Sequence, residues 1–346
     1  MARNVTVGLD IGTHAVYVAE VTDTRKGPTL TNFGGVGLPE GAVHEGEIAD
    51  VDTVAEAIEQ LYDDAGIKEK RVQVGVSNQR VVVRQVDLPY MEDDELASAL
   101  KFQVQEYIPI PVEEAELDYQ KLEELTGEGD TRLIRILLVA ADKEMVTNHV
   151  AAATRAGLRP IGADLNAFAA LRAIVPDPET VDETEMIVDV GSGVTNIVVH
   201  ERGLPRFVRI LVLGGGDITE SLQTELGMTF EEAEDAKLSA GLDGSGDVGR
   251  LIDEGAREFI DEVRGSLDYY LAQAASNPVD RMILSGGGSK LAGLPAKLED
   301  ALRIPVEEAH PLDHLRIGDT VYGPDELAEI EPMLTTAIGL AMGAIG

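Results

Sequence analysis

The sequence predicts an α/β fold made of two similar halves, each carrying one copy of the same turn. Two observations predict it. In residues 10–21 (DIGTHAVYVAEV) and again in residues 189–200 (DVGSGVTNIVVH), a strand ends at Asp-x-Gly-Ser/Thr and an apolar, β-branched strand follows at once. In the second half, the glycine runs 214–216 and 286–288 each lie between a strand-like and a helix-like segment. A duplicated α/β domain explains both observations.

The first half is predicted to occupy residues 1–83 and to resume at residues 161–178. Its hairpin is followed by a helix at Thr53–Ala65, where apolar residues have helical spacing, and by two strands within Val72–Val83. The chain is then expected to return through a helix at Ala163–Ile174. A proline-containing linker at residues 176–179 is predicted to end this half.

Residues 84–160 have a different pattern and predict a small αβ subdomain inserted into the first half. The insertion contains a helix at Glu92–Tyr107, an extended segment, the apolar strand RLIRILLVAA and a helix at Lys143–Ala156. The second half is predicted over residues 179–346. It includes a strand at Arg281–Ser285 and a final alanine-rich helix at Thr335–Ala344.

The composition is that of a globular chain with a strong acidic excess. Of its 346 residues 44% are hydrophobic, and 63 acidic residues against 28 basic ones give a formal net charge of -35. This charge argues against binding to nucleic acid or directly to anionic lipid, and it is also compatible with adaptation to a high-salt cytoplasm. Without cysteine, disulfides, thiol nucleophiles and zinc–thiolate clusters are excluded. No apolar stretch approaches the roughly 20 residues of a membrane helix, so direct membrane insertion is not expected.

The two hairpins have the residues of a phosphate and metal site. Glycine at positions 12, 191 and 193 allows a tight turn and a close approach of phosphate oxygens to the backbone. The hydroxyls of Thr13 and Ser192 are additional donors, and the carboxylates of Asp10 and Asp189 are suited to a hydrated Mg²⁺ ion. The alternative is two ordinary β-hairpins with glycine at the bend. Duplication at matched positions favours the functional interpretation.

The two glycine runs are typical of loops that a nucleotide approaches closely, because each joins a strand to a helix start. Taken alone, either run could be a simple loop. Neither run ends in the Gly-Lys-Ser/Thr of a phosphate-binding P-loop, and the first strand is not followed by the Gly-x-Gly-x-x-Gly dinucleotide pattern.

The order of these elements along the chain, two hairpins followed by two glycine loops, resembles that of the actin superfamily of nucleotide-binding proteins. The resemblance implies an actin-like fold, that is, a duplicated ribonuclease H-like fold, with connecting helices at DLNAFAALRA and TTAIGLAMGA. An αβ subdomain early in the first half is similar to that of the FtsA/PilM branch. The segment Leu100–Gln120, with its Ile-Pro-Ile-Pro and Asp-Tyr, resembles the PilM family of type IV pilus assembly proteins. An amphipathic helix with proline breakers is the simpler interpretation of that segment.

The resemblance assigns ATP and Mg²⁺ as cofactors and gives each matching position a role. Asp10 and Asp189 are expected to organise the metal ion, and Asp164 is a candidate for positioning an attacking water molecule, although it could equally cap a helix. Glu234 and Lys237, three residues apart, match ribose and adenine contacts, with a surface ion pair as the alternative. The expected phosphate and nucleoside residues are Gly12, Thr13, Gly191, Ser192, Gly193, Thr195, Asn196, Gly215, Gly216, Gly286 and Gly287.

Departures from the family pattern argue for at most a slow ATPase. Residues 14–17 (His-Ala-Val-Tyr) lack the lysine and extra hydroxyls of strongly hydrolytic members, and Asn196 stands where many members have Asp. Phosphoryl transfer depends on positioning and charge neutralisation, so these changes are expected to slow hydrolysis while leaving binding intact. His14 itself is interpreted as a surface residue of the turn.

The resemblance further implies a cytoplasmic scaffold, held at the inner face of the cytoplasmic membrane through a partner. That partner is expected to be the N-terminal cytoplasmic tail of a bitopic protein like PilN, together with other components of the pilus inner-membrane complex. Such tails are basic beside a membrane span, which suits an acidic receptor. The alternatives are an FtsA-like filament protein of cell division and a small-molecule kinase on the same fold.

Overall fold

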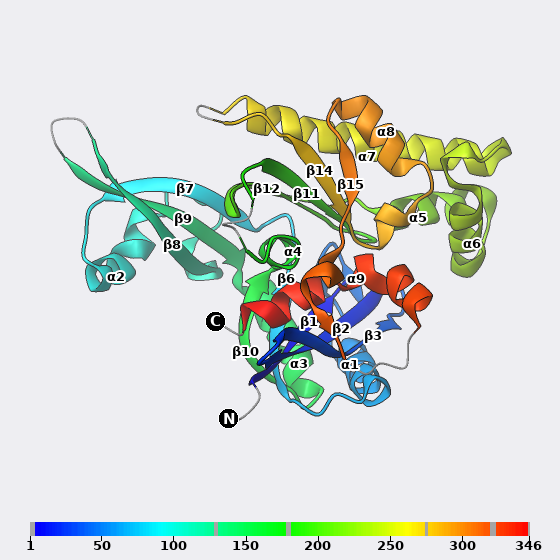
Figure 1. The fold of residues 1–346 in the computed structure, drawn as a ribbon, viewed down its shortest axis with the longest axis horizontal. Coiled ribbons are helices and arrows are strands. Elements are labelled where there is room, and N and C mark those ends of the chain that lie inside the picture. Colours follow the sequence, from blue (N-terminus) through cyan, green and yellow to red (C-terminus); the bar gives the residue numbers. More distant parts are fainter. Residues whose placement is uncertain (1–3, 128–130, 178–180, 274–275, 319–322, 345–346) are drawn as a thin grey trace.

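The computed structural model describes residues 4–127, 131–177, 181–273, 276–318 and 323–344. Figure 1 shows two sheet-based halves, with the inserted strands and α2 (Asp93–Gln103) extending to one side and α6 (Phe230–Ala240) on the opposite side. The predicted boundary between the halves, at residues 178 and 179, lies outside the described residues.

The first half is built on a six-stranded sheet in the order β10-β6-β1-β2-β3-β16. Helices α1 and α3 cover one face, where Leu9, Ile58 and Val74 are among the fully buried side chains, and α9 covers the other face. The strands and helices are β1 (Asn4–Ile11), β2 (Ala15–Thr24), β3 (Gly27–Gly37), the short pair β4 (Val43–His44) and β5 (Glu47–Ile48), α1 (Val51–Ala65), β6 (Arg71–Val76), α3 (Lys143–Arg155), β10 (Arg159–Leu165), β16 (Arg316–Ile317) and α9 (Pro324–Gly343).

The second half is built on a five-stranded sheet in the order β13-β12-β11-β14-β15. Helix α4 packs on one face of this sheet, and α5, α7 and α8 pack on the other, around a core that contains Met186, Val263 and Met282. Its elements are α4 (Asn166–Ile174), β11 (Thr184–Val190), β12 (Thr195–Glu201), β13 (Leu204–Leu211), α5 (Gly215–Leu226), α6 (Phe230–Ala240), α7 (Gly246–Leu271), β14 (Arg281–Ser285), α8 (Leu294–Leu302) and β15 (Val306–Glu308).

Helices α4 and α9 cross between the two sheets at very close range. A Cβ atom added to Gly339 would lie 1.8 Å from the carbonyl oxygen of Ala169, and one added to Gly8 would lie 2.0 Å from that of Ala337. These positions therefore need glycine. The close packing joins the halves through helix backbones rather than through long side chains.

Three predicted helices differ from the structure by three or more residues at one end. The helix predicted at Glu92–Tyr107 is α2, which ends at Gln103. Residues 163–165 are the end of β10, because Ala163 and Leu165 pair with Val74 and Val76 of β6, so α4 begins only at Asn166. Helix α9 begins at residue 324 rather than at Thr335, and it continues through Pro332. The prediction of the strand Arg281–Ser285 is confirmed.

The inserted region forms a three-stranded antiparallel sheet in the order β7-β9-β8, with α2 packed on it. Its elements are β7 (Val82–Pro89), α2 (Asp93–Gln103), β8 (Ala115–Thr126) and β9 (Arg132–Asp142). Ala152 and Ala153 of α3 belong instead to the core beneath α1. The domain boundaries stay a prediction, and we propose that the insertion ends near Asp142 rather than at residue 160.

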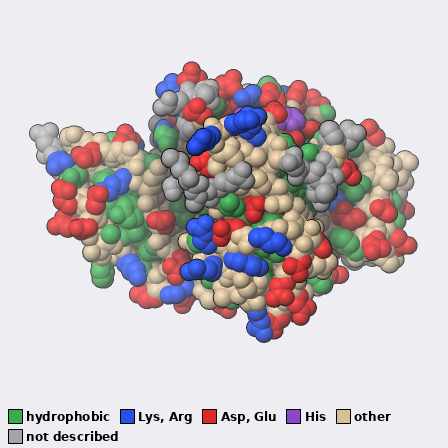
Figure 2. Space-filling view, turned by 60° about the horizontal axis from the view of Figure 1, so that its bottom comes forward, with side chains coloured by type: hydrophobic (Ala, Val, Ile, Leu, Met, Phe, Trp, Pro, Cys, Tyr) green, Lys and Arg blue, Asp and Glu red, His purple; other side chains and the backbone are tan. Residues whose placement is uncertain are grey.

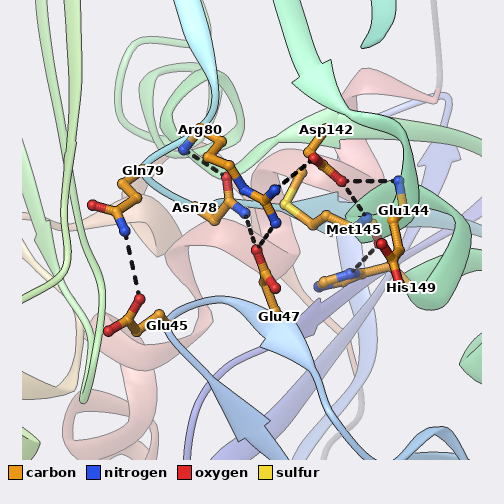
Figure 3. Close-up of polar contacts among 9 residues, drawn as sticks. All are labelled: Glu45, Glu47, Asn78, Gln79, Arg80, Asp142, Glu144, Met145 and His149. Carbon is orange, nitrogen blue, oxygen red and sulfur yellow. Dashed lines mark hydrogen bonds and ion pairs between the residues drawn. The ribbon is translucent and has the colours of Figure 1, made fainter. Parts of the chain in front are cut away.

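A network of polar side chains fastens both ends of the insertion to the first half (Figure 3). Arg80 precedes β7, and its guanidinium forms an ion pair with Asp142 at the end of β9, 2.9 Å away, and another with Glu47 of β5. Asn78 is 1% exposed and donates a hydrogen bond to Glu47 at 3.1 Å. Asp142 also caps α3 by accepting from the backbone N–H groups of Glu144 and Met145. One arginine therefore holds the entrance and the exit of the insertion together.

The charge of the protein is distributed unevenly over its surface. Figure 2 shows Asp and Glu side chains on both flanks, whereas several Lys and Arg side chains lie near the middle of that face. Parallel pairing of β10 with β6 brings the exposed Arg71 and Arg159 into register at one edge of the sheet. The acidic excess is therefore not a uniform shell.

Candidate functional site

The two predicted hairpins fold in the same way. In the first, the backbone N–H of Gly12 donates to the carbonyl of Ala15 at 2.9 Å; in the second, that of Gly191 donates to Val194 at 3.0 Å. Asp10 and Asp189 hold equivalent positions, each two residues before the turn glycine. The tips face each other, because His14 and Ser192 are in hydrogen-bond contact. The duplicated sequence thus builds two opposed turns at one cleft.

A cavity of about 530 Å³ opens between these turns. Its polar end contains the two hairpins, and its other end is lined by apolar side chains such as Ile218, Phe259 and Leu291. This combination of an apolar pocket with a few converging polar groups is typical of small-molecule sites. The predicted site residues that line it are Asp10, Gly12, Thr13, Asp189, Gly191, Ser192, Gly215, Glu234, Lys237, Gly286 and Gly287.

The remaining predicted site residues lie beside this cavity. Asn196 lines a second, smaller cavity of about 60 Å³ that both hairpins also line, and Gly193, Thr195, Gly216 and Asp164 line neither space. The hydroxyl of Thr195 donates to the carbonyl of Leu213 at 2.7 Å. Gly216 donates its N–H to the carbonyl of Ser192 at 2.8 Å. In this structure both residues shape the walls of the cleft.

The buried carboxyls of Asp10 and Asp189 are the strongest electrostatic feature of the cleft. Burial, and after it the charge of Asp189, raises the pKa of Asp10 to about 7, although a 3.0 Å hydrogen bond from Asn166 opposes the shift. Burial raises the pKa of Asp189 to about 6, against hydrogen bonds from Thr336, Ser285 and Asn196. Two carboxylates that are this costly to ionise fit a site for a cation.

The donor set suits magnesium better than a metal held by protein alone. Among the described residues no group of three or more His, Cys, Asp or Glu side chains is arranged to bind a metal ion. Mg²⁺ keeps several water ligands and usually takes one or two carboxylates together with substrate phosphates. Asp10 and Asp189 would supply those carboxylates, and the bound metal would neutralise phosphate charge.

The first glycine run is fixed to the second hairpin. Gly215 begins α5, and its N–H donates to the carbonyl of Gly191 at 3.0 Å. Glycine is required on steric grounds at two of these positions. A Cβ at Gly214 would lie 2.4 Å from the carbonyl oxygen of Gly191, and one at Gly286, where φ is 82°, would lie 2.3 Å from that of Val190. The backbone chains therefore pack against each other without intervening side chains.

Lys237 acts on the glycine run rather than projecting freely into the cavity. Its ammonium group donates to the carbonyl of Gly215 at 2.9 Å, to the hydroxyl of Thr219 at 2.8 Å and to Glu234 at 2.6 Å. These three bonds use all three of its N–H donors. Lys237 thus ties α6 to the start of α5, and the predicted nucleoside contacts of Glu234 and Lys237 stay a prediction.

Asp164 forms a structural ion pair. Its carboxylate lies 2.9 Å from the guanidinium of Arg172, which also donates to the carbonyl of Gly339 at 2.7 Å. The residue that faces the hairpin is Asn166, the first residue of α4, and its Oδ1 atom is buried with no partner. Sequence reasoning missed Asn166 because residues 163–165, the end of β10, were interpreted as the start of a helix. The role of Asp164 with water stays a prediction.

Two other residues of the cleft were also missed. Ser77, after β6, donates to the Oδ1 atom of Asn196 at 2.6 Å and connects the two halves behind the hairpins. His14, interpreted as a surface residue, is half-buried between the hairpins. Neither position has a local sequence signal, because both partners lie more than 100 residues away.

Two duplicated sheets, opposed hairpins and crossed helices define a protein of the actin-like ATPase fold, and structural comparison agrees. A chain of a solved PilM–PilN type IV pilus biogenesis complex superposes with a TM-score of 0.87 and 29% identity, covering 99% of this chain and 98% of that one. MreB5 of Spiroplasma citri bound to ADP has the same fold, with a TM-score of 0.52, 12% identity and coverage of 97% and 94%.

The family follows from the sequence comparison. The model of the type IV pilus assembly protein PilM matches residues 8–345, so the chain belongs to the PilM family. Cell division protein FtsA of Neisseria meningitidis is 25% identical over 386 aligned positions, which cover 97% of this chain and 89% of that protein. FtsA of Bacillus subtilis is 24% identical, covering 91% and 80%. The prediction of a pilus assembly protein with an actin-like fold is confirmed.

No helix in the described part of the chain is long and apolar enough to cross a membrane.

Proposed function

We propose that this protein is an ATP-binding scaffold of the type IV pilus inner-membrane complex, and that nucleotide in the cleft favours capture of a partner's tail. The observation that carries the proposal is the cavity between the opposed hairpins, with two buried carboxyls at its polar end. Asp10 and Asp189 would hold the Mg²⁺ ion. The phosphates would lie against Gly12, Thr13, Gly191 and Ser192, and the nucleoside would fill the apolar end.

The proposed partner is the N-terminal cytoplasmic tail of a PilN-like bitopic membrane protein. The similar solved chain comes from a PilM–PilN complex. A basic tail would be attracted by the acidic flanks of this protein, and binding would place the scaffold at the inner face of the cytoplasmic membrane. Other components of the pilus inner-membrane complex are further expected partners.

Hydrolysis is proposed to be slow or absent. Asp164 is bound to Arg172, and an amide side chain, that of Asn166, faces Asp10. An amide can orient water, but it cannot accept a proton as a carboxylate does. ATP would therefore serve as a ligand that draws the two halves together rather than as an energy source.

Isothermal titration tests this proposal. The full-length protein is titrated with ATP and Mg²⁺, alone and together with a synthetic tail of the partner, and the Asp189→Asn variant is the matched control. We expect ATP to bind and to raise the affinity for the tail. By linkage, the tail must then raise the affinity for ATP by the same factor.

The other outcomes distinguish the alternatives. An affinity for the tail that is the same with and without ATP would contradict the coupling. Absence of ATP binding would refute the scaffold mechanism. Sedimentable polymers formed with ATP would favour an FtsA-like filament, which the FtsA relatives keep open. Phosphorylation of a small molecule in a coupled assay would favour a kinase.

A further inference from the structure

His14 links the two halves at the polar end of the cavity. It lies at the tip of the first hairpin, and its Nδ1 atom is 2.7 Å from the hydroxyl oxygen of Ser192 at the tip of the second. Its ring stacks on Phe230, the first residue of α6, with centroids 5.0 Å apart and planes inclined by 25°. The imidazole thus contacts two separate segments of the other half.

The position of this imidazole is one that a phosphate chain needs. The Ser192 hydroxyl, which His14 contacts, is a proposed hydrogen-bond donor to phosphate. His14, Ser192 and Phe230 all line the cavity. Among the described residues, the lining contains four carboxyl side chains, Asp10, Asp189, Glu234 and Glu329, but only two lysines. Lys237 has used its donors, and Lys290 donates to the carbonyl of Glu329 at 3.0 Å. A polyanion therefore finds little uncommitted positive charge among the described lining residues.

We propose that His14 is a phosphate ligand of the bound nucleotide, and that its imidazole exchanges the Ser192 hydroxyl for a phosphate oxygen while taking up one proton from solvent. The inference rests on the proposed nucleotide site and assigns to it a residue and a charge. No covalent bond forms or breaks. The Ser192 hydroxyl, once released, donates to the same phosphate chain. The hydrogen bond between His14 and Ser192 is thus replaced by contacts that both side chains make with phosphate.

Burial of His14 favours a neutral ring without nucleotide, and the negative charges around it favour a charged ring in the complex. Burial lowers the pKa of His14. Glu234, Glu40 and Asp217 favour the charged form, whereas Lys237 opposes it. Asp10 and Asp189 face the same cavity and add negative charge when they ionise. A phosphate chain beside the ring would raise the pKa of His14 further, because an opposite charge stabilises the imidazolium.

Nuclear magnetic resonance of the histidine side chains tests the proposal directly. The full-length protein, labelled with ¹⁵N at its histidines, is titrated with pH in the presence and absence of ATP without Mg²⁺, and the His14 signals are assigned with the His14→Gln variant. We expect ATP to raise the pKa of His14 and to shift its nitrogen signals. Direct observation of the ring is necessary because Asp10 and Asp189 also exchange protons on binding.

Affinity measurements complete the test. His14→Gln keeps a hydrogen-bonding side chain but cannot gain charge, so ATP binding should weaken about tenfold at pH 6 and less than about threefold at pH 8.5. His44→Gln changes an exposed histidine outside the cavity and should leave the affinity unchanged. Unchanged His14 signals together with wild-type affinity in His14→Gln would overturn the inference but leave the nucleotide site intact. Failure of the wild-type protein to bind ATP would overturn both.

Discussion

Asp10 and Asp189 occupy equivalent positions in two hairpins of the same backbone design, yet their surroundings differ. Asp10 lies opposite Tyr17 across its hairpin, whereas Asp189 lies opposite Asn196, which hydrogen-bonds to it. Thr336 also donates to Asp189 at 3.1 Å, while Asn166 donates to Asp10. The pKa is accordingly raised to about 7 at Asp10 and to about 6 at Asp189. Duplication preserved the turn and let the polar support diverge.

The residues two positions before each of these aspartates also differ between the two halves. In the first half this residue is Gly8, on which the backbone of α9 rests directly. In the second half it is Ile187, a fully buried side chain that packs against α4. The first sheet therefore makes a close backbone contact with its crossing helix, and the second makes a side-chain contact. The two halves should respond differently to mutation at matched positions.

The largest expected difference is in stability at these matched positions. Gly8→Ala forces a Cβ atom to within 2.0 Å of a helix carbonyl, which should cost about 3 kcal/mol or more, whereas Ile187→Val should cost about 1 kcal/mol. Denaturant unfolding measures both. Gly265→Ala, at a helix position with no neighbour within 4 Å, is the control and should not destabilise. Equal losses from Gly8→Ala and Ile187→Val would contradict the comparison.

The second prediction concerns the metal ion. Asp10→Asn and Asp189→Asn each remove one proposed Mg²⁺ ligand, so the gain in ATP affinity on adding Mg²⁺ should fall about 100-fold in each variant. Titrations with ATP in the presence of Mg²⁺ and in the presence of EDTA measure this gain. Affinity for metal-free ATP should be preserved or improved, because a negative charge is lost. If a variant kept the full gain in ATP affinity on adding Mg²⁺, the substituted carboxylate would not be a ligand of the metal ion.

The third prediction uses the difference in pKa between the folded and unfolded states. A carboxyl whose pKa is raised on folding contributes stability below its unfolded pKa, near 3.8, and loses it as the pH rises to the folded value. Asp10→Asn should therefore stabilise the nucleotide-free protein by on the order of 2 kcal/mol at pH 8 but little at pH 4. Asp189→Asn should stabilise the protein less, and this stabilisation should reach its full size near pH 6, because the pKa of Asp189 is raised less. Unfolding in EDTA across this range is the measurement, and a stabilisation independent of pH would disagree with it.

The smallest expected difference concerns polar contacts of the residues opposite each aspartate. Ser77→Ala leaves the buried Oδ1 atom of Asn196 without its donor and should cost about 1–2 kcal/mol. Tyr17→Phe removes only a 3.3 Å contact with the sulfur of Met333 and should cost less than about 1 kcal/mol. Thermal unfolding of the two variants compares them. A larger loss from Tyr17→Phe would mean that the first hairpin depends more on its polar support than the second.

Local sequence patterns predicted the turns because the residues that form them are adjacent. Asp10 to Ala15 and Asp189 to Val194 carry their own glycines, strands and hydroxyls, and Arg281–Ser285 is a short apolar strand bounded by polar residues. The strand at residues 163–165 was not predictable in this way, because its partner β6 lies about 90 residues earlier. Similarly, α9 continues through Pro332, whose carbonyl accepts a hydrogen bond from the N–H of Gly286, directly after β14.

The side chains that complete the cleft depend on such distant contacts. His14 hydrogen-bonds with Ser192, Asn166 with Asp10 and Ser77 with Asn196, and each pair is more than 100 residues apart in the sequence. Periodicity and spacing carry no information about these pairs. The sequence therefore located both hairpins and their aspartates, while the residues that join one half to the other required the fold.

The ion pair between Arg80 and Asp142 has a consequence for how the chain can change over evolutionary time. Because 2.9 Å separates the side chains that enter and leave the inserted sheet, its two ends are neighbours on the surface of the first half. A short turn could bridge them, and closing such a short loop costs little conformational entropy. The insertion can thus be lengthened, exchanged or lost as one module while the cleft between the two hairpins keeps its structure.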